Sequence, residues 1–257
     1  MALRLMKRAA LGAALSLGLM GGAMAAEGEI HLPDTKFSFE GVFGTYDRAS
    51  LQRGFQVYKE VCSACHSMHL LSYRNLQEIG LNAEEVAAVA ASVQIQDGPN
   101  DNGEMFERPG RASDRFRSPF ANAAAARAAN NGALPPDFSV ITKAREGGAD
   151  YVHALLVGYG EPPEGVTVME GMHYNKYFAG HQIAMAPPLT QDGQLTFADG
   201  TNATVDQMAK DVATFLTWAA EPELESRRAM GVRVILFLAI LGGITYAVKR
   251  KIWADVH

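Results

Sequence analysis

The sequence predicts a mainly α-helical domain with long loop insertions, followed by one C-terminal transmembrane helix. Apolar residues recur every three or four positions over 50–62 and again over 205–219, which is typical of helices that bury one face. The segment 229–248 is a nearly continuous apolar run. The sequence has no internal repeat, so we expect one domain and one membrane anchor.

The N-terminal segment has the layout of a secretory signal. Three basic residues lie within the first eight positions, an apolar run follows from Ala9 to Met20, and small residues end at Ala25. A single membrane span is the competing interpretation, but the run is too short and no charged stop-transfer signal follows it. We therefore expect residues 1–25 to be a signal peptide and the mature chain to begin outside the cytoplasm.

The first half of the exported domain is expected to contain an arm and two helices. Residues 26–50 have mixed polarity without a period, which indicates an extended arm laid over the domain. Ser50 is predicted to be the N-cap of a helix that delivers Cys62 at its end. A second helix is predicted over 83–92, with Asn82 as its N-cap.

The second half is expected to alternate loops with short helices. The stretch 96–119 shows no helical or strand period, which predicts a long ordered loop. The remaining predictions are a helix over 121–129, a turn or helix from Asp137 into Arg145, a helix over 150–157, a loop or small hairpin over 158–182, and a helix over 205–219 capped by Thr204.

The C-terminal apolar run is long enough to cross a bilayer. Residues 229–248 match the ~20 residues that a ~30 Å hydrocarbon core requires, with Arg233 reaching back to the interface. A buried core helix is the competing interpretation, but no other predicted helix could cover all its sides. Equal numbers of basic residues flank the run, so the signal peptide decides the orientation. We expect residues 26–226 to lie outside and 227–257 to form the anchor and a short cytoplasmic tail.

The exported domain is strongly acidic. Residues 26–226 hold 27 Asp and Glu against 14 Lys and Arg, a net charge near −13. Such a field attracts basic partners and disfavours nucleic acid or anionic lipid as ligands. Simple solubility is the alternative explanation of the charge.

The two cysteines of the chain belong to one motif, Cys-x-x-Cys-His, at 62–66. Covalent haem attachment needs this pattern, because two thiols form thioethers with the vinyl groups and the adjacent histidine is held against the iron. A thioredoxin-like pair normally sits in an alternating strand and helix pattern, which this sequence does not show. A zinc site needs further ligands. The motif therefore predicts one covalently attached haem c, held by Cys62 and Cys65, with His66 as an iron ligand.

The second axial ligand must come from far along the chain, because a neighbour of His66 cannot reach the opposite face of the porphyrin. Met185 is the leading candidate, since small neighbours allow close approach and two prolines stiffen the backbone after it. A lone methionine is more often core filling than a ligand. The residues alone therefore leave six other candidates open: Met105, Met169, Met172, His153, His173 and His181.

Six separated motifs give the chain a wider resemblance. They lie at 62–66 with Arg74, at 97–100 with 103–106, and at 126–137, 145–148, 185–188 and 218–222. In content and order they resemble the cytochrome c1 family of the cytochrome bc1 complex, over nearly the whole mature chain. The most specific is Asn-Asn-Gly-Ala-Leu-Pro-Pro-Asp at 130–137.

The resemblance implies a cytochrome c-like haem domain in which Met185 is the axial sulfur ligand opposite His66. It also implies that Arg145 pairs with a haem propionate, that Tyr151 lies nearby, and that Pro136 packs on the haem face. Thioether ligation raises the potential, which suits a carrier near the positive end of a respiratory chain. Some bacterial relatives carry an extra disulfide before the ligand methionine. This chain lacks those cysteines, so packing must make that region rigid.

The function that the resemblance implies is one-electron transfer within a respiratory or photosynthetic quinol–cytochrome c reductase. The chain would take electrons from the Rieske iron-sulfur protein and pass them to a soluble or tethered cytochrome c, beside cytochrome b and the lipid bilayer, with no substrate turnover of its own. The implied location is a bacterial inner membrane, with the haem domain in the periplasm. The competing functions are a cytochrome subunit of a periplasmic dehydrogenase or terminal oxidase, and a haem peroxidase, which a Met185 ligand would block.

Overall fold

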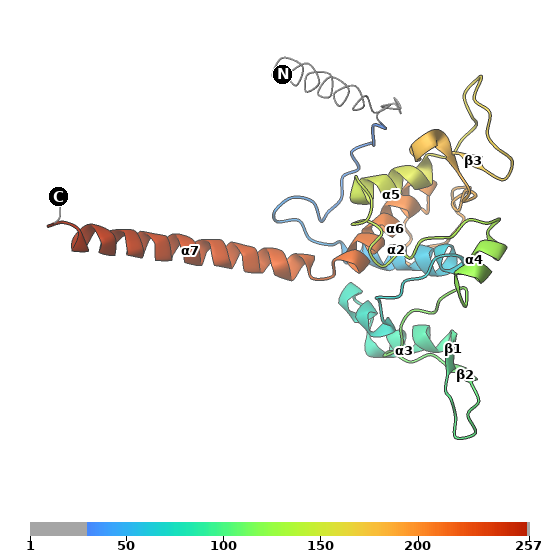
Figure 1. Cartoon of the computed structure of the whole chain (residues 1–257), viewed down its shortest axis with the longest axis horizontal. Helices are drawn as coiled ribbons and strands as arrows, with labels where there is room; N and C mark the ends of the chain where they lie inside the picture. The colour runs from blue at the N-terminus through green and yellow to red at the C-terminus, as the bar shows by residue number, and fades with distance from the viewer. Residues whose placement is uncertain (1–29, 256–257) are drawn as a thin grey trace, which may run out of the picture. The chain divides into compact units, whose positions relative to one another are not determined.

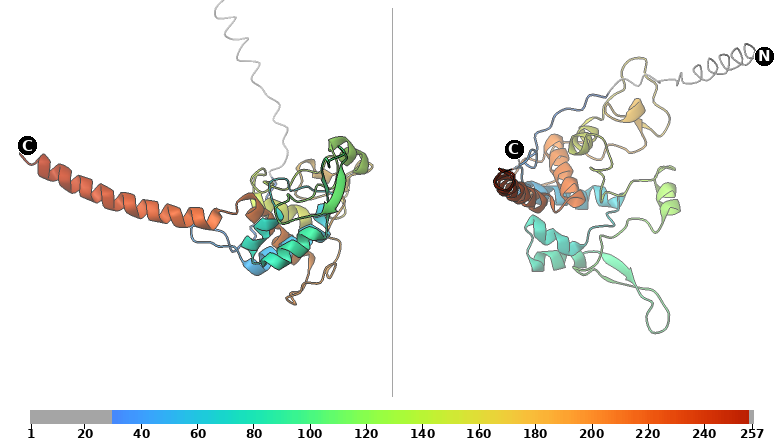
Figure 2. Two further views of the ribbon diagram at one scale, coloured as in Figure 1. Left: turned by 90° about the horizontal axis from the view of Figure 1, so that it is seen from below. Right: turned by 60° about the vertical axis from the view of Figure 1, so that its left-hand side comes forward.

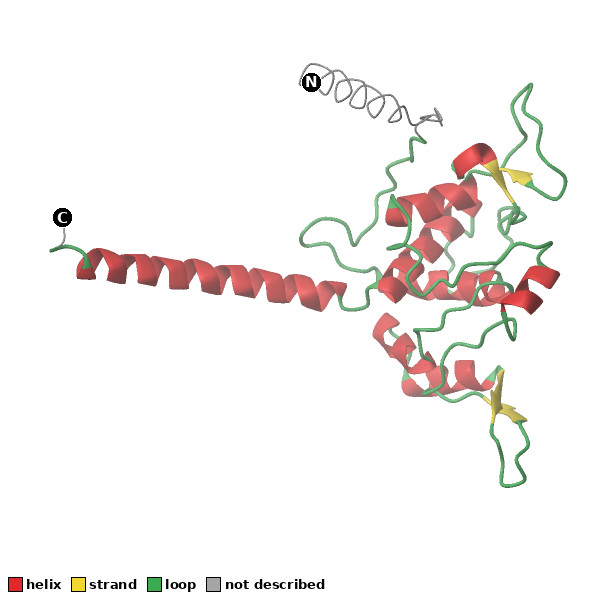
Figure 3. Cartoon of the chain, in the orientation of Figure 1, coloured by secondary structure: helices red, strands yellow, loops and turns green. Residues whose placement is uncertain are grey.

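The computed structural model describes residues 30–255, so the expected signal peptide at 1–25 lies outside the described residues. Helices dominate the described chain, with two small two-stranded sheets (Figures 1 and 3). The elements in chain order are α2 (Arg48–Glu60), η1 (Cys62–Ala64), η2 (Tyr73–Ile79), α3 (Ala83–Ala91), β1 (Gln94–Asp97), β2 (Phe106–Pro109), α4 (Ala123–Ala129), α5 (Gly148–Val157), β3 (His173–Tyr174), η3 (Ala179–His181), β4 (Gln182–Ile183), α6 (Val205–Ala220) and α7 (Leu224–Ile252).

Helices α2 and α6 pack against each other at the centre of the domain (Figure 1). Gly54 of α2 allows the close approach, because a Cβ added there would lie 2.0 Å from the carbonyl oxygen of Asp211 on α6. The buried Asp211 carboxylate accepts hydrogen bonds from Ser50 Oγ at 2.6 Å and Arg53 Nε at 2.7 Å. Pairing of this kind is what makes a buried charge tolerable. Aromatic rings of both helices fill the core at the crossing: Phe55, Tyr58, Phe215 and Trp218.

The helix that leads to the cysteine motif begins earlier than predicted. α2 starts at Arg48, and the Asp47 side chain is the N-cap, accepting from two backbone N–H groups of the first turn. The prediction of Ser50 as the N-cap is wrong. Its hydroxyl instead donates to Asp211, a core contact that only the packing of α6 supplies.

The other predicted helices are confirmed to within a few residues. α3 begins after Asn82 with a reciprocal capping box to Glu85, and the Thr204 hydroxyl caps α6 by accepting from the Gln207 N–H at 3.1 Å. α4 and α5 match their predicted ranges in the same way. The predicted loop or hairpin over 158–182 contains β3, which pairs with β4.

The stretch 96–119, predicted to be one long loop, overlaps a hairpin. β1 pairs antiparallel with β2. Arg108 of β2 bonds to the carboxylates of Asp97 and Asp114, so ion pairs tie the strands together. The strands are short and largely exposed, so they carry no alternating apolar pattern that sequence periodicity could detect.

Residues 31–47 form the extended arm that the sequence predicts. Phe37 and Phe39 are buried, with ring centroids 5.0 Å apart. The Thr35 N–H donates to the Asp150 carboxylate at 2.9 Å, and its hydroxyl lies 3.0 Å from His153 Nδ1, both residues of α5. The arm therefore lies over the domain.

α7 is the one helix among residues 30–255 that is long and apolar enough to cross a membrane. Its large apolar side chains from Val234 to Val248 are exposed, and Figure 2 shows the helix running away from the helices of the domain. It begins at Leu224, two residues after Pro222 and a few residues before the expected start of the anchor at 227. A bilayer is the surrounding that an apolar helix of this length needs when no protein covers it. The mainly α domain with one C-terminal membrane helix is thus confirmed.

Candidate haem-binding site

The Cys-x-x-Cys-His motif forms a tight turn at the end of α2. The N–H groups of Cys65 and His66 donate to the Cys62 carbonyl at 3.1 and 2.9 Å. Both cysteines are free thiols and half-buried. Burial, together with the nearby Cys65, raises the pKa of the Cys62 thiol to about 12. The turn thus presents two thiols and an imidazole from one short segment.

His66 is positioned as a metal ligand requires. The residue is 8% exposed, and its Nδ1 lies 2.9 Å from the carbonyl oxygen of Pro136. A carbonyl can only accept, so Nδ1 carries the proton and Nε2 keeps its lone pair for a metal. Burial lowers the pKa of His66, although the hydrogen bond to Pro136 opposes it, so the ring is neutral at pH 7. The Phe138 ring stacks on the imidazole with centroids 3.9 Å apart.

Residues 137–139 clamp the chain just after the motif. The Asp137 carboxylate accepts from Ser67 Oγ at 2.8 Å and from the His69 N–H at 2.9 Å. The Phe138 N–H donates to the Ser67 carbonyl at 2.8 Å. These bonds hold in place the neighbouring carbonyl that orients the histidine ring.

The same hydrogen bonds set the charge of Asp137. Burial by itself would raise the pKa of this carboxyl, but the bonds from Ser139, His69 and Ser67 outweigh burial and lower the pKa. The side chain is therefore ionised at pH 7 and can accept all of these bonds at once.

Met185 is half-buried in the segment that follows β4. Its carbonyl accepts a 3.0 Å hydrogen bond from the Tyr159 hydroxyl. The backbone of Tyr159 pairs with that of Asn175 in an isolated antiparallel β-bridge. Asn175 is fully buried, and its side-chain amide donates to the Leu155 carbonyl of α5 at 2.8 Å. Backbone contacts therefore position this segment, and the thioether has no hydrogen-bond partner within residues 30–255.

Arg145 and Tyr151 lie close together at the start of α5. The exposed Arg145 guanidinium donates to the Ala144 carbonyl at 3.0 Å and makes no ion pair with a carboxylate of the described chain. Burial raises the pKa of the half-buried Tyr151 phenol, and the positive charge of Arg145 opposes that rise. An unpaired guanidinium beside a phenol suits the binding of a carboxylate such as a haem propionate.

The structure places the predicted site residues in two groups. One holds Cys62, Cys65, His66 and Pro136. The other holds Met185, Arg145 and Tyr151, because Tyr159, which bonds to Met185, lies near Tyr151. The segment 136–148 connects them, because it starts at the carbonyl that orients the histidine and ends at α5. No hydrogen bond or ring contact between described residues joins His66 to Met185. The packing of Pro136 on a haem face stays a prediction, since the contact that the structure shows is its carbonyl bond to His66.

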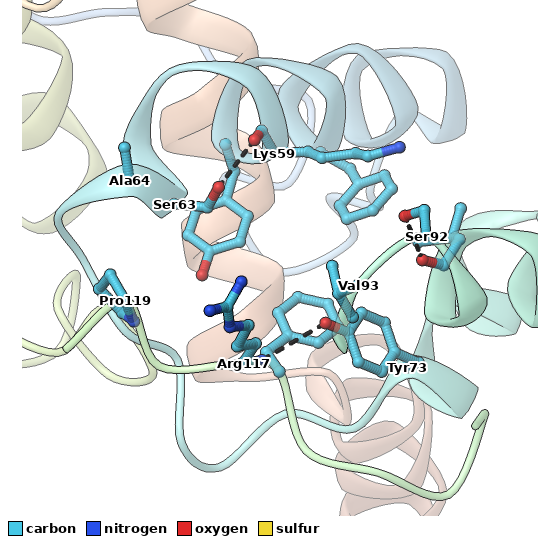
Figure 4. A pocket seen from close by; sticks show the side chains of 12 residues that line it. Lys59, Ser63, Ala64, Tyr73, Ser92, Val93, Arg117 and Pro119 are labelled. Atoms are coloured by element: carbon cyan, nitrogen blue, oxygen red, sulfur yellow. Dashed lines mark hydrogen bonds between the residues drawn. The ribbon is translucent and has the colours of Figure 1, made fainter. Parts of the chain in front are cut away.

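Two cavities border the turn formed by residues 62–66. One of about 340 Å³ lies against Ser63 and Ala64, the two residues between the cysteines, and its walls include Tyr73, Val93 and Arg117 (Figure 4). The other, of about 940 Å³, is lined in part by Cys65 and residues 134–137. Neither is lined by a member of the second group, so neither joins the two groups.

The donor set fits a c-type haem. It offers two free thiols, a neutral imidazole with Nε2 available, a half-buried thioether and an unpaired guanidinium. The thioredoxin alternative fails, because the motif follows the helix α2 and not a strand.

Sequence reasoning missed two residues that shape the site. Phe138 stacks on the imidazole, and Tyr159 holds the backbone of Met185. The Asp137-Phe138-Ser139 stretch does carry a signal, because Asp two residues before Ser is typical of a turn in which the side chain accepts from the backbone. The sequence around Tyr159 carries no such signal, since this residue lies in a loop that shows no helical or strand periodicity.

Comparison with known proteins gives concordant results. A model of the Cytochrome C1 family matches residues 37–256. The chain is 47% identical to cytochrome c1 of Rhodospirillum rubrum, over 98% of each chain. It is 52% identical to the cytochrome b/c1 of Bradyrhizobium diazoefficiens, over 95% of this chain but 39% of the length of that protein. It is 46% identical to the mitochondrial cytochrome b-c1 complex catalytic subunit of Candida albicans, over 90% of this chain and 81% of that one.

The family match runs from the buried arm through the cysteine motif to the membrane helix. The identity to the Rhodospirillum protein extends over almost all of both chains. The chain therefore belongs to the cytochrome c1 family, whose members are membrane-anchored haem proteins of electron transport.

Proposed function

We propose that this chain is the haem-bearing electron carrier of a quinol–cytochrome c reductase. It accepts one electron at a time from a Rieske iron-sulfur protein and passes it to a cytochrome c. Two relatives support an assembly with cytochrome b, since one is named cytochrome b/c1 and the other is named a subunit of the cytochrome b-c1 complex.

The orientation of His66 beside two free thiols carries this proposal. Thioether bonds at Cys62 and Cys65 attach one haem c, which supplies an iron that alternates between the ferrous and ferric states. The bond from His66 Nδ1 to the Pro136 carbonyl keeps the ring in one tautomer and one orientation. Because the ligand is held in one position, less structural rearrangement accompanies each electron transfer.

The second group of residues completes and tunes the site. Met185 would supply the second protein ligand of the iron, and a thioether ligand would favour the ferrous state and raise the reduction potential of the haem. Arg145, with Tyr151 beside it, binds a propionate carboxylate through its fork of N–H donors. With both His66 and Met185 bound to the iron, no position would be left for a peroxide, so the site would carry electrons.

The acidic exported domain supports a basic or membrane-tethered cytochrome c as the acceptor. Its 27 acidic residues against 14 basic ones create a negative field over residues 26–226. Complementary charge raises the rate at which a soluble partner is encountered. The Rieske donor is held in the same complex and needs no such steering.

We also propose the domain limits and the location. Residues 1–25 are a cleaved signal peptide, 26–226 form a periplasmic haem domain, and 227–257 are the anchor and the cytoplasmic tail in a bacterial inner membrane. The exposed apolar surface of α7 supports the anchor.

Rapid mixing of quinol with the complex purified from membranes tests this function. Quinol should reduce the haem when a Rieske protein is present in the preparation, and should fail to reduce it when that protein has been removed. Reduction by quinol without the Rieske protein, or only by the substrate of a periplasmic dehydrogenase, would contradict the proposal.

A second measurement tests the acceptor. Oxidation of the reduced haem by a basic cytochrome c should slow with salt, because the Debye length falls from ~30 Å at ~0.01 M to ~8 Å at ~0.15 M. Reduction by the Rieske protein should change less. A rate of oxidation that does not fall with salt would leave the acidic surface a role in solubility alone.

A further inference from the structure

Two apolar side chains at the tip of the N-terminal arm are exposed, although the aromatic residues of the arm on either side of them are buried. Phe43 is 84% exposed and Val42 is 68% exposed. Phe37, Phe39 and Tyr46, on either side of the tip, are all buried in the core. The tip therefore contributes nothing to the packing of the domain, and its apolar surface is open to a partner.

The tip is an ordered turn with a defined base. The Thr45 N–H donates to the Ser38 carbonyl at 3.1 Å, which closes the loop. Gly44 permits the turn, since a Cβ added there would lie 2.0 Å from the Glu40 carbonyl oxygen. The two exposed side chains are thus held outward by backbone geometry.

The base of this turn is bound to the start of the membrane helix. The Arg228 guanidinium donates to the carbonyls of Phe39 and Gly44 at 2.6 and 2.7 Å. The Glu225 carboxylate accepts from the Tyr46 N–H at 2.7 Å. Figures 1 and 2 both show the arm looping beside the first turns of α7. The tip therefore lies beside the residues where the membrane span begins.

The membrane helix itself is unequal at its two ends. Near its C-terminal end, Tyr246 is 61% exposed and Trp253 is 53% exposed, as expected of side chains at a membrane–water interface. The residues 224–236 at the other end include no aromatic side chain. Phe43 is the exposed aromatic residue that the bound turn brings to this end.

We propose that Val42 and Phe43 insert into the interfacial region of the bilayer on the exported side, as a second membrane contact beside α7. Burial in lipid removes their apolar surface from water, which favours insertion. The basic residues at the start of α7 keep the tip at the level of the headgroups, because long cationic side chains reach toward water. Since Arg228 and Glu225 tie the turn to the helix, two linked contacts limit how far the domain can tilt on its single anchor.

Photo-crosslinking in the assembled complex tests this contact. Phe43 is replaced by p-benzoylphenylalanine, the complex is irradiated in its native membrane, and the products on this chain are identified by mass spectrometry. Phe106, at 43% exposure on β2, is replaced in the same way as a matched control. Both sites are exposed, so the substitutions leave the core intact.

The expected result is a lipid adduct at position 43 and none above background at position 106. An adduct between position 43 and another protein chain, or no adduct at that position, would overturn the proposal. Equal lipid adducts at both positions would also overturn it, because they would show unspecific contact. The outcome does not depend on which donor and acceptor the haem serves, so it separates this inference from the proposed function.

Discussion

The two residues that we propose as iron ligands, His66 and Met185, are held in very different ways. The histidine side is built from a five-residue motif, and hydrogen bonds from 137–139 clamp the chain after it. The ring of His66 is fixed by the hydrogen bond that its Nδ1–H donates to the Pro136 carbonyl. The methionine side has one bond from the Tyr159 hydroxyl, and that bond goes to the backbone of Met185 and not to its side chain.

This difference indicates which side can change without loss of the cofactor. The proposed covalent attachment and the clamp both lie on the histidine side, so substitutions there should affect assembly. On the methionine side, the ligand and the bond that positions it are independent of attachment. Substitutions on the methionine side should change the reduction potential of the haem and the strength with which the sulfur binds the iron, while the haem stays in place. The variants below test this contrast, in order of decreasing effect.

The largest effect is expected from substitution of either cysteine in the Cys-x-x-Cys-His turn. Cys62→Ala or Cys65→Ala leaves at most one thioether, and a helical domain of this size depends on the haem to complete its core. Staining for covalent haem on a denaturing gel should show severe loss of holoprotein. Ser63→Ala, between the two cysteines, is the matched control and should stain as the wild type. Wild-type staining in both cysteine variants would contradict covalent haem attachment at these residues.

Met185→Leu should keep its covalent haem but lose the sulfur ligand. The potential should fall by more than ~0.1 V, within the ~0.8 V that axial ligands can span. Redox titration of the purified protein measures the shift. Met169→Leu removes an exposed methionine and should leave the potential unchanged. An unchanged potential in Met185→Leu would mean that another residue is the ligand.

Asp137→Asn should weaken the clamp on the histidine side. Asn keeps one of the two acceptor oxygens, so we expect a loss of about 1–2 kcal/mol in the free energy of unfolding. Denaturant unfolding followed by the haem absorbance gives the value. Asp101→Asn, at the exposed tip between β1 and β2, should change the free energy of unfolding little. Equal stability of the two variants would show that the clamp does not stabilise the fold.

The contribution of Asp137 should also depend on pH. Its pKa is lowered in the folded protein, so its stabilisation is present above the unfolded value of ~3.9 and is lost as the pH falls through the folded value. The stability gap between the wild type and Asp137→Asn should be constant from about pH 8 to pH 5 and shrink below about pH 4. Unfolding curves at several pH values measure it. A gap as large at pH 3 as at pH 7 would contradict this origin.

The smallest effect is expected from Tyr159→Phe. The variant loses one hydrogen bond to the backbone of Met185, a cost of about 0.5–1.5 kcal/mol. The potential should stay close to the wild-type value, while denaturant should displace the sulfur ligand at a lower concentration. Absorbance of the sulfur–iron band during a denaturant titration reports this. Tyr177→Phe is the control, and displacement at the same concentration in both variants would remove Tyr159 from its positioning role.

Prediction from the sequence was most successful where the pattern is local. The caps at Asn82 and Thr204 were found because the capping residue and its target lie within one helical turn. Ser50 was misassigned as a cap because its partner, Asp211, lies 161 residues away. The β1–β2 hairpin was missed because its strands are exposed and carry no apolar alternation.

The sequence by itself determined the haem motif, the helical class of the domain and the membrane helix. Each depends on residues that are neighbours in the chain, at spacings that the geometry of a turn, a helix or a bilayer imposes. The tertiary structure alone decided that the Pro136 carbonyl selects the tautomer of His66, that Tyr159 holds the backbone of Met185, and that Arg228 binds the arm to the membrane helix. These contacts join residues between 26 and 189 positions apart, so no local pattern in the sequence records them.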